Sequence, residues 1–247
     1  MDGFLACLKS SVIVHFKPIN SLEMKSTKNV ILASILIQCL NLHTFGQGAS
    51  QKAAYEMKYL EQKEDKKIYL HGQKSAFTGH GVERYKSGKP KFQIEYANGI
   101  QHGLTIIWWE NGKPHTQQQL KQGKQEGKTL FWFESGMKKS EADYKDGLQN
   151  GWTVFWYKSG RKRSAQLWSM GRKTGGYQEW NDAGEQGKET LKLEGEYKDG
   201  NRHGVWKYYR KDGSMQYAYQ LEDGKMRRIR RWDESGQVIM DKVVKPN

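Results

Sequence analysis

The stretch that decides the fold is Glu126-Gly-Lys-Thr-Leu-Phe-Trp-Phe-Glu-Ser-Gly-Met-Lys-Lys-Ser-Glu-Ala-Asp-Tyr-Lys-Asp-Gly147. It contains an apolar run after Gly127 and an alternating run that ends at Tyr144, and a Ser-Gly turn separates the two. The Asp-Gly dipeptide that closes the stretch is typical of a tight β-hairpin turn. The stretch therefore predicts one antiparallel hairpin.

The same unit recurs along the chain every 24 residues. A fixed period of this length indicates a repeat architecture in which each unit packs against its neighbours. Between Gly175 and Gly204 the spacing lengthens to 29 residues, which predicts an insertion in the fifth unit. The glycines that open the units are Gly79, Gly103, Gly127, Gly151 and Gly175, and those of the first turns are Gly88, Gly112, Gly136, Gly160 and Gly184.

The register predicts an all-β fold, an open antiparallel β-meander of about six 24-residue hairpin repeats in a single-layer sheet. A sheet of this many strands is expected to twist and curl. Six Asn-Gly or Asp-Gly dipeptides are strong signals of hairpin turns, because both residues can adopt positive φ. They are Asn98-Gly99, Asn111-Gly112, Asp146-Gly147, Asp199-Gly200, Asp212-Gly213 and Asp223-Gly224.

The N-terminal region reads as an over-long start followed by a secretory signal at about residues 24–46, together residues 1–46. Lys25 and Lys28 precede the apolar run of residues 30–40, and Gly46 is a suitable cleavage position. This pattern predicts an exported protein, which is periplasmic, envelope-associated or secreted. Lipidation at Cys39 is an alternative. Cys7 is the only other cysteine, so the mature chain would have no disulfide.

The remainder divides into a capping segment at residues 47–76 and a repeat array at residues 77–247. The array includes the insertion, placed at residues 185–199, and a C-terminal cap. A hydrophobic fraction of 36% and a mean hydropathy of −0.90 are low for a compact core in 247 residues, whereas 12% aromatic residues argue against disorder. Both features suit a thin sheet with an apolar stripe.

The net charge of +14 favours anionic partners, although many lysines alternate with acidic residues. The densest basic run lies in the last unit and is a candidate contact for anions. Its members are Arg227, Arg228, Arg230 and Arg231.

Two stretches resemble the MORN-repeat variant, namely Gly204-Val-Trp206-Lys-Tyr208-Tyr209-Arg-Lys-Asp-Gly213 and Tyr197-Lys-Asp-Gly200-Asn-Arg-His-Gly204. The resemblance covers about residues 77–232. The middle units depart from it where Thr105, Thr129, Thr153 and Tyr177 replace an early Trp. Bacterial proteins of this build resemble antitoxins of toxin–antitoxin systems. The resemblance therefore implies a protein-binding scaffold, with a toxin as one candidate partner.

An aromatic ladder is the candidate binding site. One row holds Trp108, Trp132, Trp156 and Trp180, and the adjacent row holds Trp109, Phe133 and Tyr157. Aromatic rows commonly stabilise neighbouring strands, but adjacent residues of a strand face opposite ways, so one row is expected to meet solvent or a partner. By strand parity, Trp109 and Tyr157 are expected to serve binding and Trp108 and Trp156 to serve folding.

The sequence shows no catalytic constellation, metal-ligand cluster or phosphate-binding loop. We therefore expect no enzymatic activity, no cofactor and no metal. The favoured function is an exported scaffold that mediates protein–protein interaction. The alternative is an envelope module that binds glycan or anionic lipid through an aromatic groove and a basic surface. Export argues against nucleic acid as a partner.

Overall fold

The computed structural model describes residues 53–182 and 187–245, which belong to one structural unit, Gln51–Asn247. The expected signal sequence lies outside these residues. None of the described helical segments has the length and apolarity needed to cross a membrane.

Strands dominate the described residues, with one short 3₁₀ helix, η1 (Met57–Tyr59). The strands are β1 (Ala54–Glu56), β2 (Leu60–Gln62), β3 (Ile68–Leu70), β4 (Gly79–Arg84), β5 (Pro90–Ala97), β6 (Ile100–Trp108), β7 (Pro114–Lys121), β8 (Lys124–Trp132), β9 (Lys138–Lys145), β10 (Leu148–Trp156), β11 (Lys162–Ser169), β12 (Arg172–Trp180), β13 (Leu191–Lys198), β14 (Asn201–Tyr209), β15 (Met215–Glu222), β16 (Lys225–Trp232) and β17 (Val238–Val243).

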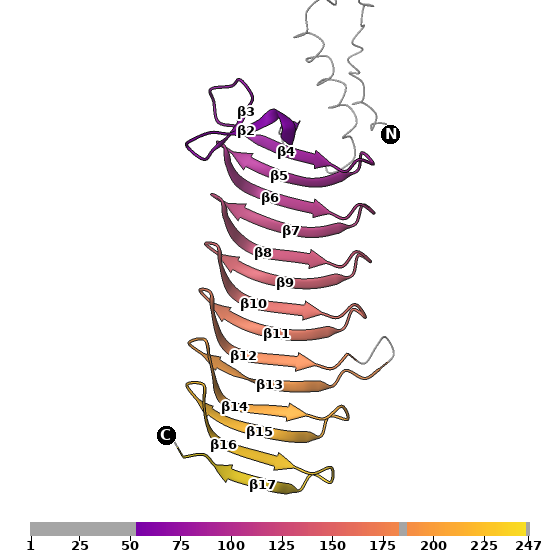
Figure 1. Cartoon of the computed structure of the whole chain (residues 1–247), viewed down its shortest axis with the longest axis vertical. Helices are drawn as coiled ribbons and strands as arrows, with labels where there is room; N and C mark the ends of the chain where they lie inside the picture. The colour runs from indigo at the N-terminus through magenta and orange to yellow at the C-terminus, as the bar shows by residue number, and fades with distance from the viewer. Residues whose placement is uncertain (1–52, 183–186, 246–247) are drawn as a thin grey trace, which may run out of the picture. The chain divides into compact units, whose positions relative to one another are not determined.

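Strands β4 to β17 lie side by side in chain order, each antiparallel to the next, in one open sheet (Figure 1). Within the described residues this sheet has 15 strands, because β1 joins β4 in parallel at the first edge. Each 24-residue unit supplies two neighbouring strands. The predicted single-layer meander of hairpin repeats is confirmed.

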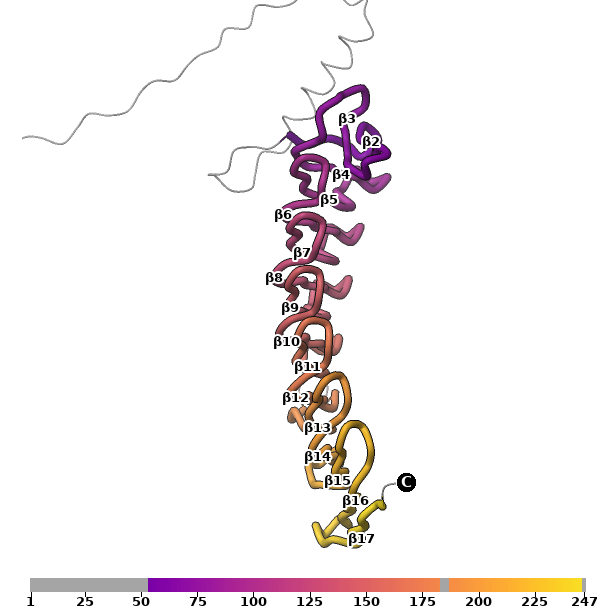
Figure 2. The backbone as a smooth tube through the Cα atoms, turned by 90° about the vertical axis from the view of Figure 1, so that its left-hand side faces the viewer, coloured from indigo at the N-terminus to yellow at the C-terminus, as the bar shows by residue number. Residues whose placement is uncertain are grey.

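Alternation along the strands gives the sheet two faces. We call the face that carries Thr105, Thr129, Thr153, Tyr177 and Trp206 the inner face, and the opposite one the outer face. The strand register shifts near the opening glycines of the units, for example between Ile94 and Tyr96 of β5. Gly103 and Gly127 have φ values of 105° and 73°, which glycine adopts without the steric cost of a Cβ. Such bulges bend strands, and Figure 2, which looks along the strands, shows that their ends curl.

The two turns of each unit differ in conformation. Asp146 and Gly147 both have positive φ, as do the equivalent pairs at residues 98–99, 199–200 and 223–224, so these turns are confirmed. Asn111-Gly112 and Asp212-Gly213 also lie in hairpin turns, between β6 and β7 and between β14 and β15, but there only the glycine has positive φ. There the side chain accepts a backbone hydrogen bond instead, as Asp212 Oδ1 does from the Ser214 N–H at 2.8 Å.

The insertion lies earlier than expected. Residues 191–198 form the regular strand β13, which pairs with β12 and β14 like any second strand of a unit. The extra length lies instead in the β12–β13 connection, residues 181–190, of which 183–186 are outside the described residues. The glycine spacing could not place it, because every position between two marker glycines satisfies the same count.

The segment before the array adds the short strand β1 beside β4. Tyr55 of β1 packs edge-on against Phe77 with ring centroids 5.6 Å apart, and Phe77 lies 5.9 Å from Tyr96 on the inner face. Strands β2 and β3 form a separate hairpin. The cap therefore extends the apolar packing of the array to its first strands.

The buried side chains follow the inner face. One row of these side chains crosses the sheet: Thr105 lies between Ile94 and Gln118, and Thr153 lies between Ala142 and Gln166. The largest buried residue is Trp206, which is 0% exposed and packs with Leu193 and Leu221. A single-layer sheet thus builds its core from rows of side chains along one face.

Candidate functional site

All seven residues of the predicted ladder lie near one end of the first strands of the units, and all are half-buried. Trp108, Trp132, Trp156 and Trp180 each end a strand. Lysines from the preceding second strands cover part of this row: Lys138 Nζ lies 5.0 Å from the Trp156 ring centroid. The row is therefore packed against cationic side chains rather than open along its length.

The adjacent row connects neighbouring repeats. The Tyr157 hydroxyl donates a hydrogen bond to the backbone oxygen of Trp180 at 2.8 Å, and the Trp109 indole N–H donates to that of Trp132 at 3.4 Å. Trp109 also packs edge-on against His115, with ring centroids 4.2 Å apart. These contacts give Trp109 and Tyr157 a structural role between units.

The strand register shows which of the two rows shares a face with the polar residues of the second strands. Gln117 pairs with Ile106, and Glu141 pairs with Leu130, so the polar side chains of the second strands share the outer face. By alternation this is the face of Trp108, not that of Trp109. The sequence alone could not settle this point, because it depends on which strand residues stand opposite one another.

The predicted basic patch is largely paired with acidic side chains. Arg228 Nε lies 2.5 Å from Asp241 Oδ1, and Arg230 Nη2 lies 3.0 Å from Asp241 Oδ2. These arginines hold the pKa of Asp241 below its usual value. Arg227 pairs with Glu222 at 2.9 Å, and the Arg231 guanidinium lies 5.7 Å from the Tyr217 ring centroid. Three of the four arginines therefore pair with two carboxylates, which leaves a net positive charge on the run.

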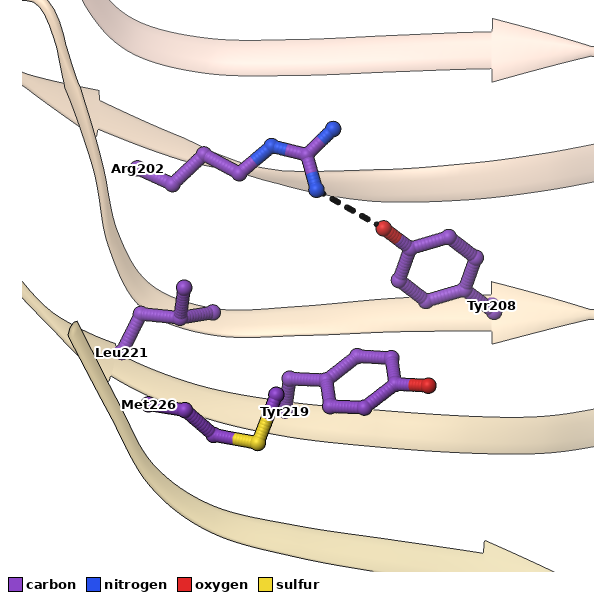
Figure 3. Close-up of a pocket in the computed structure, with 5 residues that line it drawn as sticks. All are labelled: Arg202, Tyr208, Tyr219, Leu221 and Met226. Carbon is purple, nitrogen blue, oxygen red and sulfur yellow. Dashed lines mark hydrogen bonds between the residues drawn. The ribbon is translucent and has the colours of Figure 1, made fainter. Parts of the chain in front are cut away.

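A small hollow of about 300 Å³ lies on the inner face near the last repeats, between Arg202, Tyr208, Tyr219, Leu221 and Met226 (Figure 3). Arg202 donates a hydrogen bond to the Tyr208 hydroxyl at 2.9 Å, as the dashed line shows, and its guanidinium lies 4.1 Å from the Trp206 ring centroid.

The side chains around this hollow belong mainly to the core. Tyr208 and Tyr219 pack against the buried Trp206 cluster, and Leu221 is a member of it. Their arrangement is explained by the packing of the last repeats.

A larger hollow of about 570 Å³ opens on the outer face over β10 to β14. Its lining includes Trp152 and Val205, whose exposed fractions are 44% and 46%, and Gly176, which lies on β12 between their strands. A Cβ built on Gly176 would meet only Trp152 Cη2, at 3.6 Å. The missing side chain of Gly176 therefore helps to form the hollow between two exposed apolar groups.

The polar lining of this outer hollow carries a fixed charge pair. Glu194 Oε1 accepts hydrogen bonds from Lys207 Nζ at 3.1 Å and from the Tyr209 hydroxyl at 2.8 Å. Burial alone would raise the pKa of Glu194, but these hydrogen bonds outweigh it and leave the pKa below its usual value. Burial and Glu194 together raise the pKa of Tyr209 to about 12. Glu194 is thus an anion and Tyr209 a neutral donor near neutral pH. Gln178 and Glu196 complete the polar lining.

Regular rows in the sequence do not predict the outer hollow, because its residues break the repeat. The position of Trp152 holds Leu104, Lys128, Gly176 and Val205 in other units. A departure from the repeat is thus the sequence signal at this place.

The described ranges, 53–182 and 187–245, contain no group of three or more His, Cys, Asp or Glu side chains arranged to hold a metal ion. The outer hollow combines one tryptophan, one valine and a charge pair. This set of side chains is suited to binding a ligand or partner.

Comparison with known proteins identifies the repeat. Residues 125–146, which cover β8 apart from its first residue, the following turn and all of β9, match the family model described as MORN repeat variant. No curated protein matches the chain significantly. The matched segment is the unit whose glycine register recurs across the array, and the strands of the other units pair in the same way. This unit of the chain thus resembles the MORN repeat variant.

Proposed function

We propose that the array is a non-enzymatic scaffold that binds another protein through the outer hollow. The observation that carries this proposal is the exposure of Trp152 and Val205 beside Gly176. Exposed apolar groups rimmed by polar residues mark interaction sites, and tryptophan is enriched among the residues that dominate binding energy. The antitoxin-type resemblance makes a toxin one candidate for the partner.

The groups that line the outer hollow indicate which kind of side chains the partner places there. An apolar side chain would fill the space over Gly176 and contact the Trp152 ring. Glu194 and Lys207 already satisfy one another at 3.1 Å, so they can line the rim at little cost. The partner segment is therefore an apolar anchor flanked by polar groups.

A capture experiment tests this proposal. The full chain is immobilised and exposed to an extract of its native cells, and the bound proteins are identified. Trp152→Ala is expected to lose the partner that the wild type captures, because it removes the exposed ring of the hollow. Phe155→Ala is the matched control, since Phe155 is an aromatic residue of the same strand, is 38% exposed and lies on the inner face. Equal capture by the wild type and Trp152→Ala would contradict the proposal.

A glycan is the second candidate ligand for the same hollow. The hollow is lined by the Trp152 ring and by Gln178 and Glu196, and these groups suit the apolar faces and hydroxyls of a sugar. Protease treatment of the extract separates the two candidates: it abolishes the capture of a protein and leaves the capture of a glycan intact.

Export is part of the proposed function and rests on the sequence of residues 24–46. We expect N-terminal sequencing of the protein from its native cells to find a mature chain that begins at Gln47. A mature chain that begins at Met1 or Met24 would overturn export and, with it, the proposed envelope location.

A further inference from the structure

The last strand of the sheet leaves an apolar edge open. β17 pairs only with β16 among the described strands, and its side chains are exposed on both faces. The exposed fractions are 52% for Val238, 54% for Ile239, 41% for Met240 and 69% for Val243. An exposed apolar edge strand is a template for pairing with a further strand.

The hydrogen-bond phase identifies which backbone groups this edge offers. The Val244 N–H donates to the Arg227 backbone oxygen at 2.8 Å, and bonded pairs alternate with non-bonded pairs along an antiparallel ladder. Met240 and Lys242 therefore direct their N–H and C=O groups toward β16. The groups of Asp241 and Val243, which stand opposite Arg230 and Arg228, point away from the sheet.

The two edges of the sheet differ, and this difference indicates which strand can pair with β17. The first edge ends in β1, a strand of three residues in parallel pairing, and the same segment continues into the β2–β3 cap. Very short edge strands are poor templates, so stacking the first edge of one copy on the last edge of another is disfavoured. When two copies of one edge strand meet about a two-fold axis, their pairing is antiparallel. The result is a closed dimer to which no further copy can add at that edge.

We propose that β17 pairs antiparallel with β17 of a second copy, which gives a two-fold dimer with one continuous sheet. Like charges opposite one another destabilise a sheet, so neither Asp241 nor Lys242 stands opposite itself. Pairing centred on Met240 satisfies this condition. It places Met240 against Met240, Asp241 against Ile239 and Lys242 against Val238. Arg228 and Arg230 of the same chain neutralise Asp241, so apolar side chains dominate the contact.

Charged substitutions at Met240, which lies on the proposed two-fold axis, test this dimer. The mass of the full chain in solution is measured by analytical ultracentrifugation. Met240→Lys and Met240→Glu place like charges opposite each other, so each variant alone is expected to sediment as a monomer while the wild type sediments as a dimer. An equimolar mixture of the two variants is expected to dimerise, because lysine then stands opposite glutamate. Leu148→Lys is the matched control, since Leu148 is 44% exposed but lies on β10, and it should remain dimeric.

Several outcomes would overturn the inference. A monomeric wild type removes it directly. If Met240→Lys and Met240→Glu each dimerise alone, the contact lies elsewhere. Failure of the mixture to dimerise, with variants that melt like the wild type, contradicts the register centred on Met240. None of these outcomes bears on the outer hollow, because β17 does not contribute to its lining.

Discussion

We expect Trp206→Ala to lower the free energy of unfolding by about 3–5 kcal/mol, the range for removing a large buried aromatic side chain. Trp206 is 0% exposed and lies within the inner-face core cluster. Its indole stacks on Tyr177 with ring centroids 5.7 Å apart and packs edge-on against Tyr197 at 5.1 Å. The indole N–H donates to the Glu196 backbone oxygen at 3.0 Å, so the substitution also removes a hydrogen bond.

The measurement is denaturant unfolding followed by far-UV circular dichroism, because tryptophan fluorescence changes with the substitution itself. Trp152→Ala is the matched control. It removes the same side chain from a position that is 44% exposed, so it is expected to cost much less. Equal losses for the two variants would show that the inner face does not hold the core.

The second large effect concerns Gly195, which lies under the Trp206 ring. A Cβ on Gly195 would lie 2.7 Å from Trp206 Cγ, closer than side chains approach one another. Gly195→Ala is therefore expected to cost about 1–3 kcal/mol, the usual range for overpacking a core. The equivalent position in β9 is Ala142, which is buried between Thr129 and Thr153. Alanine is thus tolerated where the facing residue is small.

A double-mutant cycle checks this explanation. Gly195→Ala is expected to be nearly neutral when combined with Trp206→Thr, because threonine copies the facing residue of the earlier units. The cost of the double variant is then close to that of Trp206→Thr alone, and the coupling between the two sites is large. Strict additivity of the two substitutions would contradict a direct clash between Gly195 and the indole.

The glycine period was sufficient to predict the sheet. Asp146-Gly147 and its equivalents set the hairpins, and the 24-residue spacing from Gly103 to Gly127 set the strand order. Both features are local, so they can be read from residues that are near one another in the chain. The position of the insertion and the conformation of Asn111-Gly112 were not predictable, because several local arrangements fit the same residues.

The candidate site was harder to predict than the fold. The ladder was predicted as the binding site because its aromatic residues, such as Trp108 and Trp132, recur. A packing role between repeats requires the same recurrence. The outer hollow depends on a single glycine, Gly176 of β12, whose strand lies between those of Trp152 and Val205. These residues are 24 or more positions apart, and only the strand register shows that they share a face.

The most direct test of the proposed function is the affinity of the captured partner for Gly176→Leu, measured by titration calorimetry with purified components. The new side chain fills the outer hollow, and its Cβ meets only Trp152 Cη2 at 3.6 Å, so the fold should retain its stability. We predict that the dissociation constant rises at least about tenfold, which corresponds to about 1.4 kcal/mol. An unchanged dissociation constant in a variant that melts like the wild type would contradict binding at the outer hollow.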